Sequence, residues 1–228
     1  MRRSQMTTRL GPDASPAGPE RLRDPERTRQ EILDVALTEF ARSGYSGARI
    51  DEIASKTRTT KRMIYYYFRN KEELYIAVLE QAYSTARDAE RKLDVDHLEP
   101  VSAIRTLAEL TFDHHESHQD FISLVAIENI HRGEFIAKSA ELAELNAPAL
   151  LVAERILQRG YTTGAFRRPT TAIDVHLLIS AYCFFRISNR YTFGALFGID
   201  LLDQATRDHY RRLVGDMIVS YLTSAPEE

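Results

Sequence analysis

The sequence predicts an all-α protein, and three observations lead to this prediction. Apolar residues recur at helical spacing along most of the chain, as Ile32, Ala36 and Phe40 do at i, i+4 and i+8. No segment sustains the alternation of apolar and polar residues that marks a half-buried strand, and no internal repeat is found. Hydrophobic residues make up 43% of the chain, which is enough to build a core for such helices.

The segment 25–44 is predicted to form the first helix. Pro25 suits the first helical position, and the acidic Glu26 is favourable in the first turn. Gly44 stands where a helix commonly ends in a left-handed residue. A second, short helix is then predicted over about residues 50–56.

The third predicted helix, residues 61–68, is the most informative segment of the chain. Thr60 is a good N-cap for it, and Ile64 and Phe68, spaced i and i+4, are expected to face the core. The rest of its surface carries cations and three consecutive tyrosines. Such a surface suits a DNA groove, where cations and phenols contact phosphates and base edges. With the second helix and the tight turn before it, this helix predicts a helix-turn-helix.

The remainder of the chain is predicted to be helix after helix. Asn70 caps a fourth helix that runs toward about residue 93, and residues 94–100 form a polar break. Further helices are expected at 101–116, 121–131, 140–159 (with Pro148 marking a kink or a junction), 171–191 and 203–222. The segment 171–191 is apolar nearly all round, which predicts burial on more than one side.

Three regions follow from these segments. Residues 25–70 are predicted to form a three-helix DNA-binding domain, and residues 71–228 a larger helical domain. Residues 1–24 are rich in proline and glycine and are expected to be a disordered basic arm. The alternative is an arm that reaches the minor groove of DNA. Its charge would come from Arg2, Arg3, Arg9, Arg21 and Arg23.

Charge is distributed unevenly along the chain. Residues 49–71 contain seven cations and two anions, a net +5, so the rest carries −8 within the total of −3. A local basic face on an acidic body suits site-directed DNA binding better than general coating of nucleic acid.

Several other classes of protein are not expected. The sequence contains no run of 18 or more apolar residues, so no membrane span is expected. Met1-Arg2-Arg3 is not followed by an apolar segment, so a signal peptide is not expected either. The single cysteine, Cys183, excludes an internal disulfide and favours a reducing cytoplasm; we expect it to be a buried small hydrophobe. No nucleophile elbow, phosphate loop or metal-ligand set appears, so neither an enzyme nor a cofactor is expected.

Many spaced positions of the N-terminal part match one known family. They are Ile32-Leu33-x-x-Ala36, Phe40, Gly44-Tyr45, Ile53-Ala54, Thr60-Lys61-Arg62-x-Ile64-Tyr65-Tyr66-Tyr67-Phe68 and Lys71-Glu72-Glu73-Leu74. Over about residues 27–80 the chain therefore resembles the TetR/AcrR family of bacterial transcriptional regulators. The segment 188–192 is similar to the late-helix segment of regulators of pyrimidine and nicotinate catabolism.

This resemblance implies a homodimer with an N-terminal DNA-binding domain and a helical ligand-binding domain. It implies that the last two helices form a four-helix dimer interface, and that an effector changes the spacing of the two recognition helices. The positions that it assigns to DNA contact are Thr60, Lys61, Arg62, Tyr65, Tyr66, Tyr67 and Lys71. Tyr67 is also expected to pack partly against the first helix. For Lys61 and Arg62 the alternative is a solvated face.

The chain departs from the family pattern at two places. Ala48 and Arg49 stand where the family often has a hydroxyl, so a phosphate contact through the Arg49 guanidinium is expected instead. Arg58 stands where the turn usually has glycine. A positive φ at Arg58 would cost about 1 kcal/mol, and such strain is typical of residues with a functional role, here a phosphate contact. The alternative is that the turn has a different geometry, without a positive φ.

Candidate ligand-binding residues come from the helices of the larger domain, and Arg186, Asn189 and Arg190 interrupt an apolar one. They are Phe112, Phe121, Val125, Asn129, Arg132, Arg186 and Asn189, with Glu128 and Arg190 as further candidates. For the polar residues of the segment 186–190, the alternative is a place in the dimer interface. The run Asp113–His118 has the composition of a metal cluster but lacks H-E-x-x-H, so we expect a solvated helix end and no metal.

The expected function is that of a ligand-responsive repressor, which binds a palindromic operator as a dimer and is released by a small-molecule effector. The alternative is a helix-turn-helix protein that acts architecturally or under a protein partner, without an effector. The sequence names neither the effector nor the operator, and it does not separate repressor from activator.

Overall fold

The computed structural model describes residues 25–146 and 150–225, and in these residues it is built of α-helices and one 3-10 helix, with no strand. The elements are α1 (Pro25–Gly47), α2 (Ile50–Lys56), α3 (Lys61–Phe68), α4 (Lys71–Arg91), α5 (Pro100–Ser117), α6 (Gln119–Ile130), η1 (Ile136–Lys138), α7 (Ala140–Asn146), α8 (Leu151–Thr162), α9 (Ala172–Ser188), α10 (Arg190–Phe197) and α11 (Gln204–Thr223). The prediction of an all-α fold is confirmed. The arm expected at residues 1–24 lies outside the described residues.

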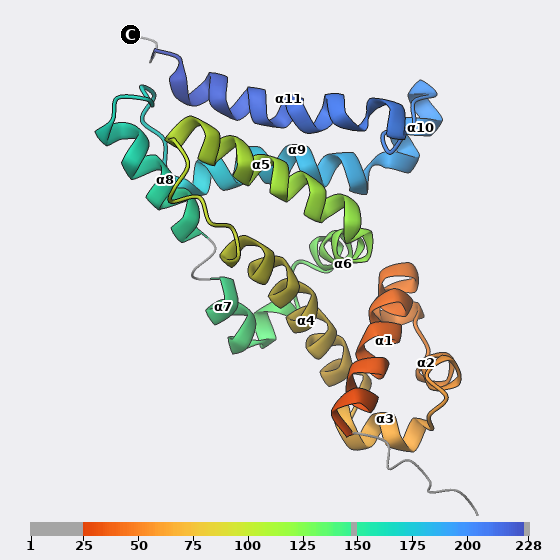
Figure 1. Ribbon diagram of the computed structural model, residues 1–228. Helices are drawn as coiled ribbons and strands as arrows, with labels where there is room; N and C mark the ends of the chain where they lie inside the picture. The colour runs from red at the N-terminus through yellow and green to blue at the C-terminus, as the bar shows by residue number, and fades with distance from the viewer. Residues whose placement is uncertain (1–24, 147–149, 226–228) are drawn as a thin grey trace, which may run out of the picture.

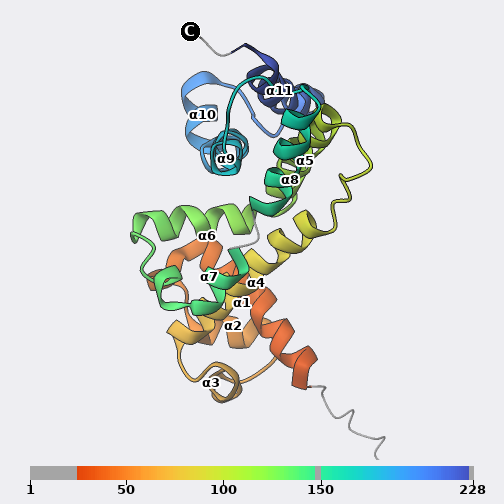
Figure 2. The ribbon, with the colours of Figure 1, turned by 90° about the vertical axis from the view of Figure 1, so that its left-hand side faces the viewer.

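The molecule is elongated, with α2 and α3 at one end and the layer of α5, α9 and α11 at the other (Figure 1). Helix α4 runs between the two ends, and α6 lies across the middle, as the perpendicular view shows (Figure 2). None of the described helices is long and apolar enough to cross a membrane.

The N-terminal helices form as the sequence predicts, because their signals are local. Helix α1 breaks at Gly44, whose φ of 69° is positive but whose ψ of 174° differs from the left-handed helical conformation expected there, and one further turn continues to Gly47. The side chains of Ile32, Phe40 and Ile64 are fully buried in one core with α4 and α6.

Two hydrophobic cores divide the protein. The first gathers residues of α1, α2, α3, α4 and α6, and the second gathers residues of α5, α8, α9 and α11. Helix α4 packs in the first core and runs from the end with α3 toward α5, which it also contacts, so it connects the two cores (Figure 1). The domain boundary at residue 70 stays a prediction.

Two predicted features of the second half differ in the structure, and a third agrees with it. The segment 140–159 has the junction that was considered for it, since it forms two helices, α7 and α8; Pro148 itself lies outside the described residues. Helix α9 ends at Ser188. Helix α10 follows and ends at Phe197, and Gly198, with a left-handed φ of 68°, caps it. Burial of α9 on more than one side is wrong for the single chain, because Leu177 is 64% exposed and Phe185 49% exposed on the face turned away from the core.

Candidate nucleic-acid interface and cavity

Helix α3 is held with one face inward and the other outward. The Thr60 hydroxyl accepts a hydrogen bond from the Met63 backbone N–H at 3.2 Å, which caps the helix as predicted. Ile64 is fully buried and Phe68 is 3% exposed, so these two side chains fix the rotation of the helix about its axis. The helix lies at the end of the molecule farthest from α11 (Figure 1).

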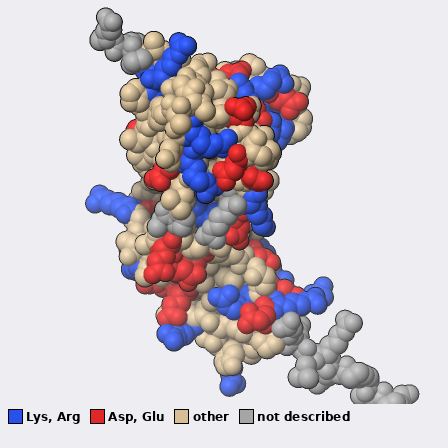
Figure 3. All heavy atoms as spheres, turned by 60° about the vertical axis from the view of Figure 1, so that its left-hand side comes forward, with Lys and Arg blue, Asp and Glu red and all other residues tan. Residues whose placement is uncertain are grey.

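The tyrosines and cations of α3 take the outer face. Tyr66 is 76% exposed, Tyr65 is less exposed, and Tyr67 is half-buried against the first core, which includes residues of α1. Arg62 is exposed, and the Nζ of Lys61 lies 3.2 Å from a carboxylate oxygen of Asp51 on α2. Figure 3 shows lysine and arginine side chains at the surface of this end of the molecule, with a group of acidic side chains above it.

The second helix and the turn after it are also fixed in place. The buried carboxylate of Glu39 on α1 forms ion pairs with Lys56 on α2 and, at 2.7 Å, with Arg42. Arg49 precedes α2 at its N-cap position and is exposed. Arg58 has a φ of 52°, so the positive φ considered for this position is present.

Lys71 begins α4 beside the end of α1. Its Nζ lies 4.9 Å from the centre of the Tyr45 ring and donates to the Ser46 carbonyl at 3.5 Å. Partial burial lowers its pKa from the ordinary value. The Asn70 side chain accepts from the Glu73 N–H at 2.9 Å and caps the helix. The ammonium is therefore held against an aromatic face at a helix start, where the dipole disfavours a cation.

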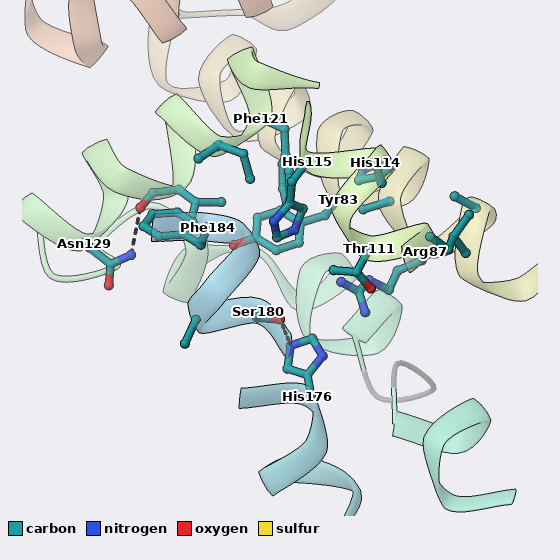
Figure 4. Close-up of a pocket in the computed structure, with 16 residues that line it drawn as sticks. Tyr83, Arg87, Thr111, His114, His115, Phe121, Asn129, His176, Ser180 and Phe184 are labelled. Carbon is teal, nitrogen blue, oxygen red and sulfur yellow. Dashed lines mark hydrogen bonds between the residues drawn. The ribbon is translucent and has the colours of Figure 1, made fainter. Parts of the chain in front are cut away.

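A cavity of about 290 Å³ lies between α4, α5, α6 and α9 (Figure 4). Three candidate residues, Phe121, Val125 and Asn129, line it. The remaining lining residues are Tyr83, Ala86, Arg87, Ala89, Leu110, Thr111, His114, His115, Ile122, His176, Ser180, Ala181 and Phe184. The cavity joins an apolar wall to a group of polar side chains, which is typical of small-molecule sites.

The histidines of α5 correct one expectation. His114 and His115 line the cavity, and burial, as the main cause, lowers the pKa of each to about 4. The expectation of a solvated helix end is therefore wrong for them. The reason is that α5 packs on both sides: Asp113 and Glu116 pair with Arg207 of α11 at 2.6 Å on the opposite side. Among the described residues, no group of three or more His, Cys, Asp and Glu side chains could hold a metal ion.

Four candidate ligand-binding residues do not line the cavity. Arg186 is 4% exposed; it pairs with Glu116 at 2.6 Å, and its guanidinium lies 4.2 Å from the centre of the Phe112 ring, so Arg186 and Phe112 join α9 to α5. Arg132 is exposed in the turn after α6, with a φ of 60°. Asn189 donates to the Ser188 hydroxyl between α9 and α10.

Glu128 of α6 belongs to a contact with the N-terminal core. Its carboxylate is 1% exposed and accepts from the Tyr75 hydroxyl at 3.0 Å and from the N–H groups of Phe135 and Ile136 at 3.2 Å. The Phe135 ring in turn lies 4.4 Å from the ring of Tyr45. The helix that supplies Phe121 and Val125 to the cavity is therefore tied to α4 and to the end of α1.

Sequence reasoning missed most of the cavity, although one signal was present. Arg87 follows Tyr83 by four residues on α4, so a cation lies on an otherwise apolar helical face, and both residues line the cavity. The predicted burial of Cys183 is confirmed: it is 1% exposed, and burial raises the pKa of its thiol to about 12.

Two family models match this chain. The model described as "Bacterial regulatory proteins, tetR family" matches residues 32–78, and the model described as "Tetracyclin repressor-like, C-terminal domain" matches residues 100–218, more than half of the chain. The chain belongs to the TetR family. It is a helix-turn-helix regulator whose α2 and α3 are the DNA-binding pair, followed by a C-terminal helical domain.

Individual members of the TetR family agree with this assignment. The transcriptional repressor NicS of Pseudomonas putida is 34% identical over 197 residues, which cover 86% of this chain and 93% of NicS. The repressor SCO4008 of Streptomyces coelicolor is 34% identical over 150 residues, 64% of this chain and 73% of that protein. The regulator RutR of Escherichia coli is 40% identical over 62 residues, 27% of this chain and 29% of RutR.

Solved structures show the same fold. The structure of SCO4942 from Streptomyces coelicolor is 29% identical, with a TM-score of 0.62, and the match covers 83% of this chain and 97% of that one. A TetR-family regulatory protein from Rhodococcus RHA1 is 17% identical with a TM-score of 0.67, covering 88% and 99%, which supports the fold alone.

Proposed function

We propose that this protein is a dimeric repressor that binds a palindromic operator and is released by a small-molecule effector. The observation that carries the proposal is the course of α4. Its first residue, Lys71, lies beside the DNA-binding helices, and its residues Tyr83 and Arg87 line the cavity. A molecule in the cavity therefore contacts the helix that begins at the DNA-binding domain.

DNA contact is assigned to the outward face of α3 and its neighbours. The residues are Arg49, Thr60, Lys61, Arg62, Tyr65, Tyr66, Tyr67 and Lys71. Lys61, Arg62 and Arg49 would meet phosphates, and the exposed phenol rings would meet phosphates and base edges. A regulator of this kind acts on the bacterial chromosome in the cytoplasm. The repressor assignment is supported by the names of NicS and SCO4008, both described as transcriptional repressors.

Dimerisation is assigned to α9 and α11, the last two long helices. Ile173, Leu177 and Phe185 of α9 are 49–64% exposed in the single chain, and Met217 of α11 is 48% exposed. A face with this many large apolar side chains is typical of a protein–protein interface. The two-fold symmetry of such a dimer predicts operator half-sites about one helical turn apart or somewhat more.

Release by effector requires that the two states of the dimer bind the effector with different affinities. The contacts of Glu128 with Tyr75 and Phe135 offer a route, because they tie the cavity helix α6 to α4 and to the end of α1. We infer that the effector changes the position of α4 relative to α6, and with it the spacing of the two α3 helices.

The test is selection of bound fragments from the genome that encodes this chain, followed by a screen of small molecules against the selected site. We expect a palindromic site occupied by a dimer, and at least one compound that both raises the melting temperature and lowers operator affinity. Binding without sequence preference, or by a monomer to one half-site, would contradict the proposal. If no compound acts in either assay, the alternative of regulation by a protein partner is favoured.

A further inference from the structure

We propose that α10 is part of the dimer interface, and that its exposed apolar side chains are covered by the N-terminal half of α9 in a second copy of this chain. This inference rests on the proposed dimer, and it extends the interface beyond α9 and α11. The partner that it names is the chain itself.

Helix α10 has an apolar sequence but contributes nothing to either core. None of its eight residues is buried, and Tyr191, Leu196 and Phe197 are 74%, 77% and 63% exposed. Its one charged residue, Arg190, lies with its guanidinium 4.3 Å from the centre of the Tyr191 ring. Helices shorter than about 12 residues are marginal in water without packing partners. An apolar helix of this length, left uncovered in the single chain, is therefore typical of a surface that another protein covers.

The exposed surface of α10 continues an apolar stripe on α9. Four exposed residues follow one another at four-residue spacing, and so lie along one face of α9: Ile173, Leu177, Ala181 and Phe185. The Phe185 ring meets the Phe193 ring of α10 edge to face, with centres 6.2 Å apart, and Phe193 lies 4.6 Å from Phe197. Figure 2 shows α10 beside α9, on the side away from α5 and α8. One partner surface can therefore cover the stripe and α10 together.

Helix α11 offers less apolar surface than α10. Among the described residues, Met217 is the only large apolar side chain of α11 that is exposed. The exposed positions of this helix also include the charged residues Asp208, Arg212 and Asp216. Apolar cover for the α9 stripe of a second copy is therefore more readily supplied by α10 than by α11.

The area of α10 is large enough to matter to a dimer. A fully covered aromatic side chain buries about 150–250 Å², so the exposed parts of Tyr191 and Phe197 amount to roughly 100–180 Å² each. A stable interface buries about 800 Å² per partner. Together with Leu196, these side chains would supply on the order of a third of that area.

Symmetry decides which part of the partner meets α10. In the proposed dimer both copies of α3 face the same DNA, so the two-fold axis runs along the length of the molecule. Helix α9 runs across that length (Figure 1). A two-fold axis perpendicular to a helix reverses the direction of its copy, so the two α9 helices are antiparallel. Because α10 follows the C-terminal end of α9, it meets the N-terminal half of the other α9, which carries Ile173 and Leu177.

The dissociation constant of the full-length dimer without DNA tests the contribution of α10. Sedimentation velocity with fluorescence detection measures it from nanomolar to micromolar protein. Leu196→Glu places a charge in the proposed contact, and the variant should fold, since Leu196 is exposed in the single chain. Each dimer carries the change twice, so two losses of about tenfold multiply, and we expect the dissociation constant to rise at least about a hundredfold.

The matched control is Leu151→Glu, the same change at an exposed leucine that begins α8, on the side of α9 away from α10 (Figure 2). It should leave the dissociation constant unchanged, and circular dichroism checks that both variants fold. If folded Leu196→Glu dimerises as tightly as Leu151→Glu, the role of α10 is overturned.

Cross-linking tests the antiparallel contact. With a short bismaleimide, the double variant Ile173→Cys plus Leu196→Cys should give a covalent dimer, and either single variant should give little. The native Cys183 does not compete, because it is 1% exposed and burial raises the pKa of its thiol to about 12. If the double variant forms no covalent dimer, or if Leu196→Cys forms one alone, the contact between α10 and the other α9 is overturned.

Failure of this contact is distinguishable from failure of the proposed function. If the wild-type protein is a monomer at micromolar concentration and on its operator, the proposed dimer itself fails. If the wild type and both glutamate variants are equally tight dimers, the dimer stands and the contribution of α10 fails.

Discussion

Replacement of Tyr75 by phenylalanine tests the contact that joins the cavity helix α6 to α4, the helix that begins beside the DNA-binding helices. The Tyr75 side chain is fully buried, and its hydroxyl donates to the Glu128 carboxylate at 3.0 Å. Burial, followed by the charge and the hydrogen bond of Glu128, raises the pKa of the phenol above its ordinary value. The hydroxyl is therefore an obligate donor to a buried anion.

The expected loss follows from this geometry. A hydrogen bond to a charged group contributes about 1.5–3 kcal/mol, and Tyr75→Phe removes the donor to Oε1 while Oε2 keeps the N–H groups of Phe135 and Ile136. We therefore expect the free energy of unfolding to fall by about 2 kcal/mol. Glu128→Ala should cost more, because it leaves the phenol and both N–H groups buried without an acceptor.

Urea unfolding, followed by circular dichroism, measures the change. All variants are compared at one fixed protomer concentration, since the stability of the proposed dimer would depend on concentration. The matched control is Tyr161→Phe. That phenol is 38% exposed; it donates to the neutral carbonyls of Arg168 and Thr170 and accepts from the Thr170 N–H. Because these groups are open to water, water replaces the lost bonds, and the loss should stay below about 0.5 kcal/mol. The reasoning is refuted if Tyr75→Phe loses no more stability than Tyr161→Phe.

Three further predictions concern the DNA-binding surface, the packing of α8 and the cavity histidines. Asp51→Asn removes the carboxylate that pairs with Lys61 at 3.2 Å, so operator affinity should rise by up to about fivefold; weaker binding would contradict this. Gly160→Ala places a Cβ within 1.9 Å of the Phe166 ring and should lower the free energy of unfolding by about 1–3 kcal/mol; an unchanged melting temperature would contradict the packing. The pKa of His115 is about 4 in the folded protein and 6.5 in the unfolded chain. Between pH 6.5 and pH 4 the unfolded state therefore binds more protons than the folded state, so the free energy of unfolding falls as the pH drops through this range. Between pH 7.5 and 5 the wild type should lose about 2 kcal/mol more than His115→Asn in urea unfolding, and equal losses would refute this.

The DNA-binding surface was predictable because its determinants lie close together in the chain. The Thr60 cap sets the start of α3, and the i, i+4 pair Ile64 and Phe68 sets which side faces inward; the positions of Lys61 and Arg62 follow from the 3.6-residue period. No long-range contact is needed for this deduction.

The cavity was not predictable in the same way. Its lining comes from four helices between residues 83 and 184, and the rotation of each depends on packing that no local pattern records. Helix α5 is the clearest case. Asp113 and His114 are adjacent in sequence, yet Asp113 pairs with α11 and His114 faces the cavity, because α5 packs on both sides. A polar run that resembled a solvated helix end is therefore divided between an ion-pair network and the lining of a cavity.

The central claim, that the outward face of α3 meets DNA, is tested most directly by the salt dependence of operator binding. The measurement is the slope of log K against log salt for the wild type, for Lys61→Ala and Arg62→Ala, and for the control Arg155→Ala on α8, at the other end of the molecule from α3 (Figure 1). Each lost phosphate contact should reduce the slope by about 0.9 and weaken binding across sequences. The account predicts a flatter slope for Lys61→Ala and Arg62→Ala and an unchanged slope for Arg155→Ala. Unchanged slopes for both α3 variants would contradict it.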